Sequence, residues 1–215
     1  TFYRNVSQLP DFEDYNMTGR TYRYMQDTPL FSFGYGLSYT TFSYGKVVLD
    51  RSEVTAGQTL KLTVPVTNTG KRGGEEVVQV YLKKQGDAEG PVKTLRAFKR
   101  VFIPAGQTTN IEFDLKDKEL EWWDEQTNTV RVCSGTYDIM VGGSSEDESL
   151  RRTLVTIKEY FLNIRLRGSL KDPRNLYIIC WKLFSHDLCG VTMNDIHILH
   201  ILLYIYYRLI VNRLL

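Results

Sequence analysis

Three acidic residues near the start of the chain, Asp11, Glu13 and Asp14 in DFEDY, lie close enough in sequence to suggest a pair of catalytic carboxyl groups. Such a pair could act as general acid and general base. The surrounding residues show no sustained period of a helix or a strand, however, and clustered acids in an irregular loop are usually just solvated. We therefore expect these three carboxylates to be surface charges.

The stretch GRTYRY, residues 19–24, is the best candidate for ligand binding. Arg20 and Arg23 could donate forked hydrogen bonds to hydroxyl groups or to a carboxylate, and Tyr22 or Tyr24 could stack on a sugar ring. The same side chains could instead hold two domains together by ion pairs and aromatic packing, which is the interpretation we favour. If they have a functional role, we expect all four to lie next to substrate rather than to react with it.

Two adjacent tryptophans, Trp122 and Trp123, could form an aromatic platform for a sugar. Adjacent strand residues point to opposite faces, so at most one of them fits a core. We favour burial of one and contact of the other with solvent or a second domain. Gly142 and Gly143 lack a surrounding phosphate-loop pattern and are expected to end a strand.

The tail of the chain contains five potential metal ligands: Cys180, His186, Cys189, His197 and His200. Zinc sites need closely paired ligands, and the spacing C-x5-H-x2-C-x7-H-x2-H contains neither usual pair. We expect no metal site here and no cofactor in the chain. Residues 196–215 are apolar but are interrupted by two histidines and by Arg208, so a membrane is not the expected partner.

Composition divides the chain near Tyr160. Residues 161–215 contain 7 Lys and Arg against 3 Asp and Glu, whereas the first 160 residues contain 20 against 22. Of the last 55 residues, 24 are Ile, Leu or Tyr. This tail is expected to be poorly defined or helical, either as a tether or as unselected sequence from a shifted frame or an intron. The net charge of +2 is too small to indicate strong electrostatic attraction to nucleic acid.

Alternating apolar residues predict an all-β domain between about residues 41 and 160. The predicted strands cover 42–50, 60–70, 75–84, 92–103, 110–115, 120–132, 135–143 and 150–160. Leu95, Ala97 and Val101 are expected to point inward from the fourth of them. Short strands separated by Gly, Pro and Asn at this spacing are typical of an immunoglobulin-like β-sandwich.

Four ordered stretches resemble one known family: PLFSFGYGLSYTTF (29–42), LTVPVTNTGKRGGEEVVQVYL (62–82), PVKTLRAFKRVFIPAGQT (91–108) and SGTYDIMVGGSSED (134–147). They resemble the C-terminal region of glycoside hydrolase family 3, the β-glucosidases and β-xylosidases, whose last domain is fibronectin type III-like. The resemblance implies three parts. Residues 1–33 would end the preceding α/β domain and form an irregular linker, 34–160 would form the fibronectin type III-like sandwich, and 161–215 would lie outside the family.

The resemblance also implies a parent enzyme that hydrolyses a terminal β-linked sugar with retention, using two carboxyl groups. In the family both groups lie upstream of the region matched here. The chain opens at Thr1 without an initiator Met or a signal-peptide pattern, and we expect it to be a fragment that is inactive alone. Its expected partners are the upstream catalytic domains and, through them, an oligosaccharide; the parent is expected to be secreted or periplasmic.

In this setting the aromatic stretch FSFGYG, residues 31–36, is expected to form the seam between two domains. Large apolar rings suit such a seam, and glycine permits backbone angles that other residues disfavour. The predicted seam residues are Phe31, Phe33, Gly34, Tyr35 and Gly36.

Besides a product tethered to a membrane by its tail, two functions remain open. The first is an accessory domain that braces the catalytic domains of a β-xylosidase or β-glucosidase in carbohydrate degradation. The alternative is an independent β-sandwich module that binds a carbohydrate or a protein.

Overall fold

The structure, a computed structural model, describes residues 1–146 and 148–159. The chain divides into two compact units, the first made of Thr1–Trp123 and Val130–Glu159, the second of Asp124–Thr129 and Tyr160–Leu215. The predictions made for residues 161–215, including the metal and membrane interpretations, lie outside the described residues.

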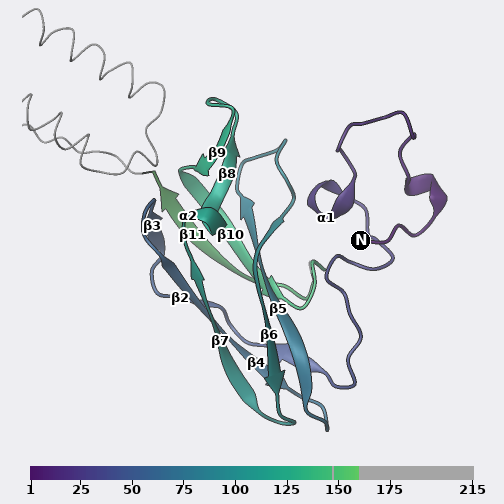
Figure 1. The fold of residues 1–215 in the computed structure, drawn as a ribbon, viewed down its shortest axis with the longest axis vertical. Helices are drawn as coiled ribbons and strands as arrows, with labels where there is room; N and C mark the ends of the chain where they lie inside the picture. The colour runs from purple at the N-terminus through teal and green to yellow at the C-terminus, as the bar shows by residue number, and fades with distance from the viewer. Residues whose placement is uncertain (147, 160–215) are drawn as a thin grey trace, which may run out of the picture. The chain divides into compact units, whose positions relative to one another are not determined.

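Within the described residues, eleven strands form three sheets (Figure 1). The strands are β1 Phe42–Tyr44, β2 Val48–Leu49, β3 Glu53–Thr55, β4 Leu60–Asn68, β5 Gly74–Lys84, β6 Thr94–Ile103, β7 Thr108–Leu115, β8 Glu121–Asp124, β9 Thr129–Val132, β10 Gly135–Gly142 and β11 Arg151–Lys158. The short helices are η1 Val6–Gln8, α1 Thr21–Tyr24 and α2 Asp117–Leu120.

The two larger sheets form the predicted β-sandwich. In the four-stranded sheet, β4 is central and pairs antiparallel with β1, β2 and β7. The five-stranded sheet has the order β3-β11-β10-β5-β6, and only its β3–β11 pair is parallel. Strands β8 and β9 make a separate two-stranded sheet. The all-β fold class predicted from the sequence is therefore confirmed.

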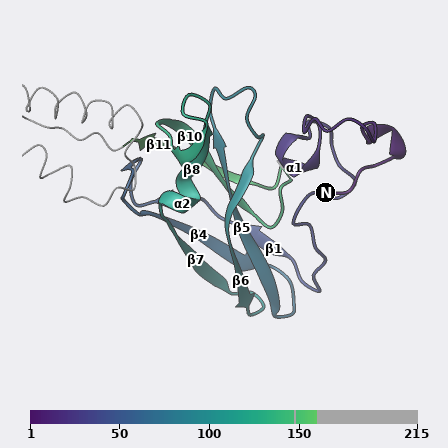
Figure 2. The same ribbon diagram turned by 45° about the horizontal axis from the view of Figure 1, so that its top comes forward.

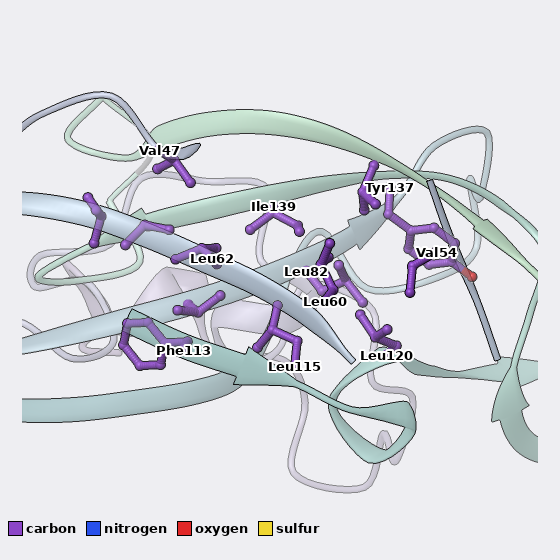
Figure 3. Close-up of a cluster of buried hydrophobic side chains, with 14 of the residues drawn as sticks. Val47, Val54, Leu60, Leu62, Leu82, Phe113, Leu115, Leu120, Tyr137 and Ile139 are labelled. Carbon is purple, nitrogen blue, oxygen red and sulfur yellow. The ribbon is translucent and has the colours of Figure 1, made fainter. Parts of the chain in front are cut away.

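The main core lies between the two larger sheets because alternate residues of each strand point the same way. In β4 the inward residues Leu60, Leu62, Val64 and Val66 are all fully buried. Figure 3 shows Leu60 gathered with Leu82 and Leu115, which come from β5 and β7. Full burial of each such aliphatic side chain stabilises the fold by about 1.5–3 kcal/mol.

Asn68 ends β4 with a buried amide whose hydrogen bonds are satisfied. Its Nδ2 donates to the carbonyl oxygens of Arg72 (2.8 Å) and Ile103 (2.9 Å). Its Oδ1 accepts from Thr40 Oγ1 (2.6 Å) and from the Gly70 amide (3.0 Å). A buried amide is tolerated only with such partners, and this one ties the turn after β4 to the end of β6 and to Thr40, just before β1.

The structure corrects several details of the predicted strands. Residues 42–50 form two short strands, β1 and β2, rather than one, and 120–132 form β8 and β9 joined by a turn. Glu53–Thr55, which the sequence places in a turn, is the strand β3. Leu95 packs outside the main core, because a register shift between Val80 and Tyr81 brings it opposite Tyr81.

Candidate functional site

A second apolar cluster lies on the outer face of the five-stranded sheet. Tyr81 and Met140 alternate along β5 and β10 with residues of the main core, so they point to the opposite face of the sheet. Leu150 is buried with them, and Tyr22, Phe33 and Leu95 pack against the three. In Figures 1 and 2, α1 accordingly lies beside this sheet on the side away from β4 and β7. We call residues 1–39 the N-terminal segment, and this cluster is where it attaches.

Tyr22 is the centre of the attachment. Its ring stacks on Phe33, with centroids 4.2 Å apart and planes inclined by 14°, and it meets the Tyr81 ring edge-on at 6.0 Å. The Leu95 amide donates a hydrogen bond to Tyr22 Oη over 3.1 Å. The ring is therefore used for packing on the sheet.

Gln79 fastens the chain next to Phe33. Its side chain is buried, Nε2 donates to the carbonyl oxygens of Gly34 (3.3 Å) and Gly143, and Oε1 accepts from Tyr81 Oη (2.6 Å). Gly34 has φ of +80°, and a Cβ there would lie 2.1 Å from Gln79 Oε1. Glycine is thus required at 34 both for its backbone angle and for the close approach of Gln79.

Gly36 does not meet the expectation placed on it. Its φ lies outside the left-handed region, and a Cβ would find no atom within 4 Å. The conformational reason given for glycine therefore applies at position 34 and not at 36.

The arginines of GRTYRY contact the protein itself. Arg20 donates from Nε to the Asn16 carbonyl (2.7 Å) and from its terminal nitrogen to the Asp14 carbonyl, which closes its own loop. Arg23 reaches Thr94 Oγ1 at 3.4 Å and lies over the Tyr24 ring at 5.9 Å. These contacts order the N-terminal segment, and the substrate-adjacent role of the four residues stays a prediction.

The other seam residues form an exposed aromatic row. Phe31 stacks on Tyr35 with centroids 5.2 Å apart and meets Phe2 edge-on at 6.0 Å. The backbone supports the row, because Phe2 and Phe31 form an isolated antiparallel bridge. All three rings are at least 44% exposed, so they present apolar surface outward.

The remaining sequence candidates have local structural roles. Asp11 and Asp14 are exposed and accept hydrogen bonds from backbone amides two residues ahead. Trp122 is buried in the main core and donates from Nε1 to Asp87 over 2.6 Å, whereas the neighbouring Trp123 is 49% exposed. The two tryptophans thus point to opposite sides, as strand geometry requires, and form no joint platform.

One feature that the sequence analysis missed is a carboxylate at the end of the main core. Glu76 lies on β5 two residues before Val78, on the face that points inward, and accepts a hydrogen bond from Tyr44 Oη over 2.7 Å. Burial raises the pKa of the Glu76 carboxyl, an effect that the hydrogen bond from Tyr44 opposes. The signal was available, because Glu76 continues the alternation of Val78, Val80 and Leu82.

No group of three or more metal-binding side chains lies together in residues 1–146 and 148–159. Over the same residues, no helix has the length and apolar character needed to cross a bilayer.

The class of domain follows from this fold. The fibronectin type III-like domain family matches residues 76–145, which run from β5 to the turn after β10. The sandwich is thus a fibronectin type III-like domain.

Relatives with known names point to one group of enzymes. The chain is 47% identical over 157 residues to a xylan 1,4-beta-xylosidase of Xylanibacter ruminicola, a match that covers 73% of this chain and 18% of that protein. It is 40% identical over 164 residues to a beta-xylosidase of Formosa agariphila, covering 74% of this chain and 22% of that protein. The chain therefore spans about a fifth of the length of these relatives.

Solved structures agree with the sequence relatives. A β-glucosidase from Erythrobacter marinus superposes with a TM-score of 0.60 at 34% identity, over 73% of this chain and 21% of that one. A β-glucosidase from Listeria innocua has a TM-score of 0.56 at 29% identity, over 75% and 22%. The resemblance stated from the sequence is confirmed: this is a fibronectin type III-like domain of the kind carried by family 3 β-glucosidases and β-xylosidases.

Proposed function

We propose that this chain is the C-terminal accessory part of a retaining β-glycosidase, a β-xylosidase or β-glucosidase, and that it braces the catalytic domains of the same polypeptide. In this proposal the sandwich is a rigid support and the N-terminal segment is the contact with the catalytic domains. Hydrolysis is carried out by carboxyl groups of those domains, and the chain alone gives no turnover.

The observation that carries the proposal is the distribution of exposed apolar side chains. The described residues include 18 large hydrophobic side chains that are exposed, and 11 of these lie before residue 40. Phe12, Leu37 and Tyr39 are 94%, 91% and 95% exposed. So much apolar surface on one short segment is typical of an interface with another body rather than of a free surface.

The attachment of the segment favours a brace over a flexible tether. Tyr22 and Phe33 are packed on Tyr81, and Gln79 holds the backbone at Gly34, so the segment is fixed to the sheet in its middle. Its exposed rings are therefore presented in a fixed arrangement. A preorganised surface loses less conformational entropy when it meets its partner, which favours a stable contact between domains.

A chimera tests the proposal. The matching segment of the Xylanibacter xylosidase is replaced by this chain, and turnover of nitrophenyl β-xyloside and the melting temperature are measured. We expect an active chimera whose melting temperature falls when Phe12 and Tyr39 are changed to serine. In the isolated chain the same two substitutions leave the melting temperature unchanged, because both side chains are more than nine-tenths exposed.

Phe98→Ser is the matched control, since Phe98 is an exposed aromatic on β6 outside the N-terminal segment. It should change neither the chimera nor the isolated chain. The bracing role would be disproved if Phe12→Ser and Tyr39→Ser left the melting temperature of the chimera unchanged, or if Phe98→Ser lowered it equally. Turnover by the isolated chain would disprove the assignment of the chemistry to other domains.

A further inference from the structure

A polar groove lies where the N-terminal segment enters the sandwich. Its volume is about 470 Å³, and it is bounded by residues 35–44 on one side and by residues of 143–146 and 148–151 on the other, with Glu76 of β5 between them. We call it the linker groove. Ligand pockets for small molecules typically have volumes of about 300–1,000 Å³, so the groove can hold one sugar ring.

The carboxylate in this groove stands where a core residue is expected. Glu76 shares the inward face of β5 with Val78 and Val80, yet its only hydrogen bond in the described part of the chain is from Tyr44 Oη, and no cation pairs with it there. A half-buried carboxylate without a cationic partner destabilises a fold, because burial removes part of its hydration. Such a group at the wall of a cavity is a functional candidate.

The backbone beside Glu76 keeps the carboxylate accessible. A Cβ at Gly143 would lie 2.5 Å from Glu76 Oε1 and 3.4 Å from Tyr44 Oη. Any side chain at this position would therefore push the carboxylate aside. The φ of Gly143 lies outside the left-handed region, so the backbone itself would accept another residue. Glycine is needed at this position because a side chain would occupy the space next to Glu76.

The rest of the lining combines the acids Glu146 and Glu148 with one base and several hydroxyl groups, which can all form hydrogen bonds with a polyhydroxy ligand. Arg151 is held by a hydrogen bond from Nε to the Tyr44 carbonyl (2.8 Å), which leaves its terminal nitrogens as donors, and Ser38 and Ser149 add hydroxyl groups. The Tyr35 ring at the edge is 49% exposed and backed by Phe31. Sugar hydroxyls can donate to a carboxylate and accept from arginine, while the apolar face of a pyranose packs on an aromatic ring.

From this geometry we infer that the linker groove binds one pyranose unit of a neutral saccharide, with Glu76 accepting from adjacent hydroxyls, Arg151 donating and Tyr35 packing on the ring. This inference does not depend on the bracing role. It gives the domain a binding site of its own, separate from the upstream site at which the sugar is cleaved.

Binding to the full 215-residue chain tests the inference. Xylotriose and cellotriose are titrated by calorimetry at millimolar concentrations, with the aliphatic diamine cadaverine as a rival probe. We expect at least one of the two sugars to bind, and Glu76→Gln and Gly143→Ala each to weaken it about tenfold or more, because a hydrogen bond to a charged group contributes about 1.5–3 kcal/mol. Tyr35→Ala should weaken it as well, and this half-exposed residue can be truncated without unfolding the domain.

Glu112→Gln is the matched control, since Glu112 is an exposed acid on β7 outside the groove. This variant should bind sugar as tightly as the unsubstituted chain does. All variants should show an unchanged far-ultraviolet circular dichroism spectrum. Absence of sugar binding overturns the inference, and so does sugar binding that Glu76→Gln and Gly143→Ala leave unchanged. Binding of cadaverine alone also overturns it and identifies the groove as a receptor for a basic side chain.

Discussion

Replacing Gly34 with alanine should release the N-terminal segment from the sheet while the sandwich stays folded. The φ of +80° at this position costs an L-residue about 1–2 kcal/mol. A Cβ would also lie 2.1 Å from Gln79 Oε1, so the Gln79 side chain must move. Moving it disrupts its hydrogen bonds with Gly34, Gly143 and Tyr81, each of which contributes about 0.5–1.5 kcal/mol. Allowing for partial relaxation, the attachment should weaken by about 2–4 kcal/mol.

Hydrogen exchange measures this loss at two amides that report on the attachment. The Leu95 amide donates to Tyr22 Oη and the Val92 amide donates to the Arg23 carbonyl, so both lose their acceptors when the segment leaves. In Gly34→Ala their protection against exchange should fall by about 30-fold to about 1,000-fold, which corresponds to 2–4 kcal/mol. Amides in the middle of β4 should keep their protection, because their partners lie in the sandwich itself.

Gly36→Ala is the matched comparison, because position 36 has no left-handed φ and no neighbouring atom within 4 Å of a Cβ. Its amide protection should equal that of the parent chain. The reasoning fails if Gly34→Ala leaves Leu95 and Val92 protected, or if Gly36→Ala exposes them to the same extent. It also fails if protection is lost across β4, since the segment and the sandwich would then unfold as one unit.

Three further predictions concern the sandwich. Asn68→Ala should lower the free energy of urea unfolding by about 3 kcal/mol, because it leaves the buried Ile103 carbonyl and two part-buried backbone groups, the Arg72 carbonyl and the Gly70 amide, without their partner; a loss below about 1 kcal/mol would contradict this. Trp122→Ala should lower the free energy of unfolding by about 3–5 kcal/mol, and Trp123→Ala should lower it by less than about 0.5 kcal/mol. Equal losses would contradict the expectation that the buried tryptophan contributes more to stability than the exposed one. Glu76→Gln should be more stable than the parent chain at pH 7. The folded-state pKa of Glu76 is raised above its ordinary value of 4.5, so the parent loses stability as the pH rises from that value through the folded pKa, and the variant does not. The gain should disappear below about pH 4 in urea titrations, and a gain of the same size at both pH values would refute the linkage.

The sandwich could be predicted because alternation along a strand is a local property of the sequence. The alternation in β4 predicts its inward face, and the structure buries all four residues on that face: Leu60, Leu62, Val64 and Val66. The same rule separates Trp122 from Trp123. These predictions need no knowledge of which strand is the neighbour, only of the two faces of a strand.

What the sequence did not reveal depends on contacts between distant residues. Alternation places Tyr81 and Met140 on the outward face of the sheet, for which the sequence predicts exposure to solvent. In the structure, α1 and Phe33 cover them from far upstream. β3 is three residues long and is held by parallel pairing with β11, about a hundred positions later. An extra residue on β6, opposite the step from Val80 to Tyr81, moves Leu95 from one face to the other, and no local residue pattern signals it.

The two apolar clusters differ in size and in how they are closed. The main core joins residues from both larger sheets, whereas the second cluster has only three buried members and is closed by the N-terminal segment. Elements with few buried contacts open locally at lower free energy than the core. The segment should therefore detach from the sheet at a lower free energy than the sandwich needs to unfold. Gln79 and Tyr81 hold the segment from β5, the strand whose inward face also carries Glu76. Tyr35, Gly36 and Ser38 of the segment also line the linker groove, so we expect detachment of the segment to change the wall of the groove.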